Sequence, residues 1–225
     1  MIGRAAVPKR FHRWQPEVSV EWLTLLICLY LAVIFNDAFW EAALSGRSMG
    51  EISTWRLLLG TSIALCALHF TAFVCFANRW TVKPLLGAVV VTSAMAAYYM
   101  DQYTVFMDPD MLRNVLHTEY KEARELVTFG FASNVLLWSL GPLLLLWRVR
   151  ILHRPWLRAA TVRVLSVITA IAIAVGGLAR GYRDLSALMR NQKEVRYLVT
   201  PGNVLYGAGR VFLTDARKSQ QVVTP

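Results

Sequence analysis

The hydrophobic positions of the chain fall into long runs that are separated by short polar segments. Five of these runs reach the length that a helix needs to cross about 30 Å of hydrocarbon. The runs cover residues 18–40, 55–77, 82–100, 127–147 and 161–179. Inside lipid a helix is required, because every backbone N–H and C=O must be satisfied within its own segment. The pattern therefore predicts an all-α membrane protein, a polytopic bundle of five transmembrane helices.

The composition weighs against the alternative, a buried helical bundle in a soluble protein. Hydrophobic residues make up 56% of the chain and charged residues 17%, whereas soluble domains carry about 25% charged residues. The runs take up nearly half of the 225 residues and leave only short segments between them. We therefore expect a transmembrane domain over residues 1–179, followed by a bridging helix and linker over residues 180–225.

The distribution of charge predicts the orientation of the bundle. Lys and Arg gather before the first run and, without any acid, in the second and fourth connections; they are Arg4, Lys9, Arg10, Arg13, Arg79, Lys83, Arg148, Arg150, Arg154, Arg158 and Arg163. Acids gather in the third connection, residues 101–126. By the positive-inside rule, the N-terminus is cytoplasmic, whereas residues 101–126 and the C-terminal tail lie outside.

The net charge of +10 could suggest a nucleic-acid partner. However, the basic residues are dispersed at the ends of the runs and form no aromatic-studded basic surface. Anionic lipid of the inner leaflet is the better partner for them. We therefore expect membrane lipids as partners and no nucleic acid.

The polar segment between the third and fourth runs is the candidate functional segment. Asp108 can cap a helix that begins at Pro109. In one continuous helix over residues 108–126, Asn114, Thr118 and Glu122 recur at i, i+4 and i+8 and form one polar stripe. Apolar residues gather on the opposite side: Leu112, Val115, Leu116, Ala123 and Leu126. The pattern indicates an amphipathic helix at the outer interface, whose stripe either binds a lipid head group or is simply solvated.

The run from Met111 to Leu126 resembles the signature of the bacterial lipid A phosphoethanolamine transferases, a family that includes the mobile colistin resistance proteins. Further matches to the family pattern lie outside this run: Tyr103, Tyr197, Pro201, Gly202, Asn203 and Tyr206. The five runs and the external tail also fit. The resemblance covers nearly the whole chain and implies a place in the bacterial inner membrane, with interfacial helices and the C-terminus in the periplasm.

The family resemblance also implies an activity and separate roles for a membrane domain and a catalytic domain. In that family, five membrane helices precede a periplasmic, zinc-dependent catalytic domain of alkaline-phosphatase-like fold. A catalytic Thr takes phosphoethanolamine from phosphatidylethanolamine and passes it to a lipid A phosphate, which confers polymyxin resistance. Carried over by position, the residues that hold the donor head group are Tyr103, Asn114, Thr118 and Glu122.

The chain departs from the family in lacking a counterpart of the catalytic domain. Its four His residues are scattered (His12, His69, His117 and His153), and no Asp, Glu or Cys joins them in the convergent geometry of a zinc site. No Thr has a setting that would activate it as a nucleophile. We therefore expect no catalytic residue and no metal or other cofactor in this chain, and zinc in the missing domain.

The sequence accordingly predicts the N-terminal membrane domain of such a transferase, truncated or encoded separately, which anchors the enzyme and presents the donor lipid to a periplasmic catalytic domain. Without that catalytic domain, the chain should not catalyse the transfer. A non-catalytic membrane binding or scaffold protein is the alternative. A transporter is disfavoured, because His69 is the only candidate for an ionisable residue in the middle of a run. The acceptor (lipid A, core sugar or glucan) and a natural end at Pro225 stay open.

Overall fold

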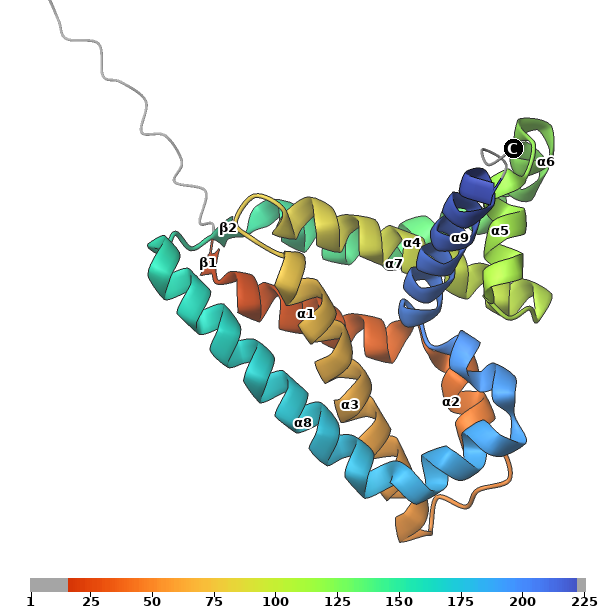
Figure 1. Cartoon of the computed structure of the whole chain (residues 1–225), viewed down its shortest axis with the longest axis horizontal. Helices are drawn as coiled ribbons and strands as arrows, with labels where there is room; N and C mark the ends of the chain where they lie inside the picture. Colours follow the sequence, from red (N-terminus) through yellow and green to blue (C-terminus); the bar gives the residue numbers. More distant parts are fainter. Residues whose placement is uncertain (1–15, 222–225) are drawn as a thin grey trace, which may run out of the picture.

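The computed structural model describes residues 16–221 and shows an all-α fold with one pair of two-residue strands (Figure 1). The elements in chain order are β1 (Glu17–Val18), α1 (Val20–Ile34), α2 (Asp37–Leu44), α3 (Ile52–Phe76), α4 (Val82–Tyr103), α5 (Pro109–His117), α6 (Tyr120–Leu126), α7 (Phe129–Arg148), β2 (Arg150–Ile151), α8 (Trp156–Asn191), η1 (Lys193–Leu198) and α9 (Gly202–Gln221). The predicted all-α membrane bundle is thus confirmed. Residues Arg4, Lys9, Arg10, His12 and Arg13, used in the sequence arguments, lie outside the described part.

Four helices are long and apolar enough to cross a membrane, namely α3, α4, α7 and α8. A fifth span is formed if α1 and α2 are taken together, although the pair bends by 56° between them. The bend falls at Asn36, whose Nδ2 donates to the carbonyl oxygen of Leu31 at 2.9 Å. A side chain that binds local backbone groups competes with the helical ladder. The first run is therefore a broken span rather than one helix over residues 18–40.

Helix α8 extends well beyond the predicted span over residues 161–179. Its 36 residues correspond to about 54 Å, compared with about 30 Å of hydrocarbon. The polar residues after Gly177 continue the helix as far as Asn191. Part of α8 must therefore project beyond the apolar layer.

The most extensive helix packing joins α3 and α8, which come together toward the bottom of Figure 1. Gly60 and Gly177 face each other there, and a Cβ placed on either would lie 2.7 Å from the carbonyl oxygen of the other. Small residues allow such close approach in lipid, where no hydrophobic drive brings helices together. The two helices can therefore approach this closely only because Gly60 and Gly177 have no side chain.

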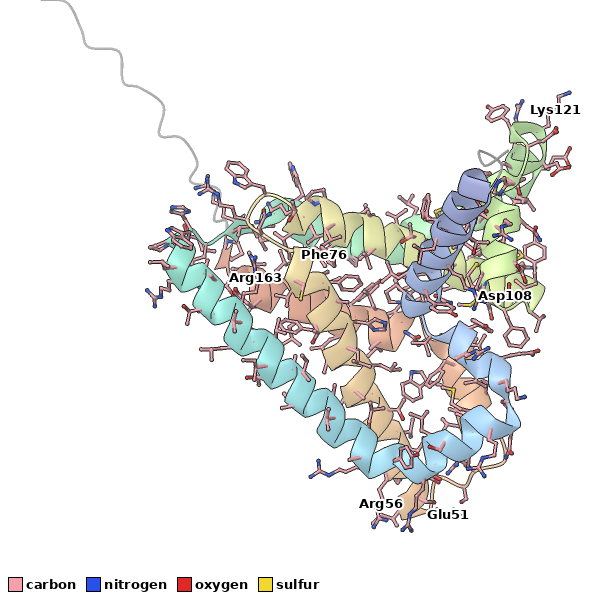
Figure 2. All side chains as sticks on the ribbon, viewed as in Figure 1. Glu51, Arg56, Phe76, Asp108, Lys121 and Arg163 are labelled. Carbon is pink, nitrogen blue, oxygen red and sulfur yellow. The ribbon has the colours of Figure 1, made fainter. Side chains whose placement is uncertain are left out.

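The elements outside the long helices gather at two separate ends of the bundle. At one end, β1 pairs in parallel with β2, so that Glu17 lies opposite Arg150. Arg163 and Phe76 lie near this end in Figure 2, whereas Glu51 and Arg56 lie at the far end. Helices α2, α5, α6 and α9 lie away from the strand pair in Figure 1. The second and fourth connections, in which the basic residues gather, therefore lie at the same end of the bundle.

Candidate functional site

The predicted helix over residues 108–126 is two helices, α5 and α6, with a break at Thr118 and Glu119. The start is as expected, because the Asp108 carboxylate accepts a hydrogen bond from the Met111 amide at 2.7 Å and Pro109 is the first helical residue. The backbone then becomes extended, with ψ of 129° at Thr118 and 149° at Glu119. The prediction of one continuous polar stripe is therefore wrong.

A side-chain hydrogen bond accompanies this break. The Thr118 hydroxyl donates to the backbone carbonyl oxygen of Asn114 at 2.7 Å. Back-bonding of this kind gives the backbone an alternative to the next helical turn. Asn114 and Thr118 are therefore brought together at the end of α5, whereas Glu122 belongs to α6.

Helix α5 is held in place by α9. Leu112 is buried, and a Cβ placed on Gly207 of α9 would lie 3.1 Å from its Cδ2 atom. Arg113 Nη2 also contacts the Asp215 carboxylate at 3.3 Å. The rest of the predicted apolar face does not pack in this way, since Val115 and Leu116 are exposed. Sequence reasoning missed Asp215, a partner that lies 102 positions away.

Tyr103 lies at the end of α4 and connects indirectly to α6. Its ring stacks on Tyr99 with centroids 5.7 Å apart. The Tyr99 hydroxyl in turn donates to the carbonyl oxygen of Leu126 at 3.1 Å. The structure therefore joins Asn114 to Thr118 directly and Tyr103 to α6 through Tyr99. Among the described residues, Glu122 forms no hydrogen bond or ion pair with the other three side chains, and Glu122 itself is exposed.

A second polar surface lies where η1 meets α9. The rings of Tyr197 and Tyr206 have centroids 6.5 Å apart. The Arg196 guanidinium lies 4.7 Å from the Tyr197 ring centroid, and Arg210 donates to the Tyr206 hydroxyl at 2.9 Å. This hydrogen bond is the main cause that raises the pKa of Arg210 above its ordinary value. The tyrosines match the family pattern, but the two arginines were not anticipated.

The start of α9 is anchored by buried polar residues. Asn36 binds both backbone groups of Thr200, and Asn203 Nδ2 donates to the carbonyl oxygen of Tyr197 at 2.8 Å. Thr200 and Asn203 are both buried. The sequence shows this segment only as a turn after Tyr197. The signal for this anchor in the sequence is Asn36, a polar residue within the first apolar run.

A cleft of about 760 Å³ lies beside these elements, between α2, the residues after α4, and the end of α8 with η1. Its charged lining residues are Glu41, Arg190, Lys193 and Glu194. None of the four predicted head-group residues lines it. The sequence pattern does not predict this cleft, because Glu41 lies about 150 positions before the other charged lining residues.

No group of three or more His, Cys, Asp or Glu side chains within residues 16–221 could hold a metal ion. His117, for example, binds the backbone carbonyl oxygen of Arg113 through Nδ1 at 2.8 Å. The described residues therefore offer no ligand set for the zinc, which the family resemblance assigns to a catalytic domain.

Comparisons with known proteins match the sequence as well as the fold. The family described as phosphoethanolamine transferase EptA/EptB matches residues 65–216. Phosphatidylethanolamine transferase Mcr-2 of Escherichia coli is 20% identical over 194 residues, which cover 86% of this chain and 36% of that protein. Phosphoethanolamine transferase EptA of Salmonella typhimurium is 24% identical over 196 residues, which cover 87% of this chain and 36% of that protein.

A solved structure has the same fold. The integral membrane protein lipooligosaccharide phosphoethanolamine transferase A (EptA) from Neisseria meningitidis superposes with a TM-score of 0.81 at 22% identity. The match covers 93% of this chain and 38% of that chain. The chain thus spans little more than a third of the length of the relatives that it matches.

Proposed function

The chain belongs to the phosphoethanolamine transferase EptA/EptB family, and from this premise we propose that it holds the phosphatidylethanolamine donor for a catalytic domain outside this chain. It is a membrane domain of that family. The observation that carries the proposal is the family match over residues 65–216, which includes all four candidate residues. Tyr103 lies on α4, Asn114 on α5 and Glu122 on α6, and Thr118 directly follows α5. Their exposed or half-exposed side chains leave them accessible to a lipid head group.

The proposed orientation places α5, α6 and α9 in the periplasm and the strand pair on the cytoplasmic side. It is supported by the segregation of charge, since Arg79, Arg154 and Arg163 line one cleft beside β1. Acidic residues, among them Glu122, lie in the connection at the other end of α4. The donor head group would then be taken from the outer leaflet of the inner membrane.

In the proposed complex, the Glu122 carboxylate accepts hydrogen bonds from the ethanolamine ammonium. Charge-assisted hydrogen bonds of this type are about twice as strong as neutral ones. Asn114, Thr118 and Tyr103 orient the phosphate. The Thr118 hydroxyl donates to Asn114 in the described conformation, so a phosphate oxygen would replace that carbonyl as the acceptor.

The contribution of this domain to catalysis is positioning. Holding the phosphodiester in place removes much of the entropic cost of bringing it to a nucleophile. The nucleophile, the zinc chemistry and the binding of the acceptor, lipid A, are assigned to residues outside this chain. No step of the transfer is assigned to a metal here, because the described residues offer no ligand set.

A head-group binding measurement tests the proposal on the purified chain. Short-chain phosphatidylethanolamine is titrated in detergent and compared with the matching phosphatidylcholine, whose quaternary ammonium offers no N–H. Wild type should prefer phosphatidylethanolamine, and Glu122→Gln should remove the preference. Glu51→Gln, which removes the same charge at the start of α3, should keep it. Equal binding of both lipids by wild type would favour a scaffold without donor recognition.

A further inference from the structure

The end of the bundle that carries the strand pair holds a basic cleft of about 460 Å³. It is enclosed by the turn after α3, the segment after β2 and the first turns of α8. Its charged and titratable lining residues are Glu21, Arg79, His153, Arg154 and Arg163. Figure 2 shows Arg163 at this end, far from Lys121 of α6. The cleft is therefore separate from the proposed donor site.

Within residues 16–221, protein groups neutralise the cations of this cleft only in part. Arg154 Nη1 pairs with the Glu21 carboxylate at 3.0 Å. Arg79 Nη1 lies 2.6 Å from His153 Nδ1, and its guanidinium lies 4.3 Å from the Trp80 ring centroid. Neither contact supplies negative charge. Arg163 Nε is buried and has no hydrogen-bond partner among the described residues, a condition that is costly for a charged group.

The backbone adds further donors to the same cleft. Helix α8 begins at Trp156 with Pro155 as its N-cap residue and no side-chain cap. The amides of a first helical turn have no partner within the helix, and they favour an anion. Together with Arg79 and Arg163, they make this cleft an environment for a phosphate group.

An apolar groove of about 970 Å³ continues from the cleft between α1, α3 and α8, and the two share Ser19, Glu21 and Arg154. Its walls are almost wholly apolar and include Leu25, Leu29, Phe70, Leu165 and Ile173. Along α8 the lining residues run from Val162 to Ile173, about 16 Å at the rise of an α-helix. This is about half the thickness of the hydrocarbon layer, so the groove has the depth of one leaflet.

Two exposed tryptophans mark the level of the cleft in the membrane. Trp80 and Trp156 both line it and are 74% and 76% exposed. Tryptophan is enriched at the membrane–water interface, where the ring lies among the head groups. The basic cleft is therefore at head-group depth, and the groove extends from it into the hydrocarbon.

We propose that this cleft and groove together bind one anionic glycerophospholipid of the leaflet at the strand-pair end. The phosphate lies between Arg79, Arg163 and the first turn of α8, and one acyl chain lies in the groove along α3. The lipid would neutralise the two arginines and fill the space between α1 and α8. This site is distinct from donor binding, and the proposal holds whether or not the donor site is correct.

The test is a lipid titration of the purified chain, with bound lipid counted by native mass spectrometry. Wild type should retain one phosphatidylglycerol in preference to phosphatidylcholine of the same acyl chains. Arg79→Gln should weaken phosphatidylglycerol binding about fivefold, the effect of about 1 kcal/mol per basic residue near an anionic surface. Arg79→Gln with Arg163→Gln should abolish the preference. Arg183→Gln, an exposed position on the far part of α8, should change neither.

A second variant separates lipid from free phosphate. Ser166→Trp fills the groove and should weaken both phospholipids, whereas Thr161→Trp on the exposed side of α8 should not. Inorganic phosphate in excess should not displace the lipid. Displacement by phosphate, equal binding of both lipids to wild type, or unchanged binding in Ser166→Trp and the double arginine variant with retained helical circular dichroism would each overturn the proposal.

Discussion

The side-chain amide of Asn36 pairs with both backbone groups of Thr200, 164 residues further along the chain. Nδ2 donates to the Thr200 carbonyl oxygen at 3.0 Å, and Oδ1 accepts from the Thr200 amide at 2.9 Å. Both residues are buried, and Asn36 stands at the bend between α1 and α2. The pair therefore fixes the start of α9 to the first span, and α9 in turn supports α5 and the candidate site.

We expect Asn36→Ala to destabilise the chain. It would leave a buried N–H and a buried C=O of Thr200 without partners, at a cost of about 1–3 kcal/mol for each group. The measurement is the thermal unfolding midpoint in detergent, with Asn191→Ala at an exposed position as the control. An Asn36→Ala midpoint equal to that of the control would show that water or another group replaces the amide.

The close contact of α3 and α8 gives a second prediction. Gly177→Ala places a Cβ 2.7 Å from the Gly60 carbonyl oxygen, whereas a Cβ on the neighbouring Gly176 meets nothing within 4 Å. We expect Gly177→Ala to lower the unfolding midpoint by forcing the helices apart. Gly176→Ala should raise it slightly, since Ala is favoured over Gly in a helix by about 1 kcal/mol. The prediction fails if the two variants unfold alike.

The spans could be predicted from the sequence because an apolar segment in lipid must satisfy its own backbone hydrogen bonds, which leaves few alternatives to a helix. Each predicted run has a helix at its core, and the Asp108–Pro109 start of α5 followed from capping chemistry alone. The break at Thr118 could not be predicted in this way. The spacing of Asn114, Thr118 and Glu122 suits one helix, while the contacts that fix α6, such as Tyr99 to Leu126, come from elsewhere in the chain.

The partners that position the site were also beyond the sequence. Asp215 binds Arg113 across 102 positions, and Thr200 binds Asn36 across 164. Periodicity and spacing report only on neighbours within one element. The identity of the candidate head-group residues came from the family resemblance, and their role in donor binding stays a prediction.

The packing of α5 on α9 provides a third prediction. Gly207→Val would crowd Leu112, whose Cδ2 lies 3.1 Å from the Cβ position, whereas Gly209 has nothing within 4 Å. We expect Gly207→Val to loosen α5 and to speed amide hydrogen exchange over residues 109–117, with the spans unaffected. Gly209→Val controls for the lower helix propensity of Val. Equal exchange in both variants would mean that Arg113–Asp215 and other contacts hold α5 without this packing.

The scattered His and acidic residues give a fourth prediction, about metal. The purified chain should bind zinc below one equivalent, because three or four ligands must converge on a structural or catalytic zinc ion and residues 16–221 bring none together. Inductively coupled plasma mass spectrometry after dialysis against zinc measures this directly. Stoichiometric zinc that survives a weak chelator would assign metal chemistry to this chain and contradict the division of roles proposed above.

The hydroxyl of Thr118 gives the sharpest test of the head-group site. Thr118→Val keeps the shape of the side chain but loses the proton that Thr118 now donates to Asn114 at 2.7 Å. If that proton turns to a phosphate oxygen in the complex, phosphatidylethanolamine binding should weaken about three- to tenfold, the effect of one net hydrogen bond. Thr118→Ser retains the donor and should bind nearly as wild type. Because Thr118→Val also removes the bond to Asn114, hydrogen exchange of α5 in the lipid-free chain must be compared in both variants. Weakened binding with unchanged exchange assigns the loss to the lipid contact, whereas wild-type binding by Thr118→Val removes Thr118 from the site.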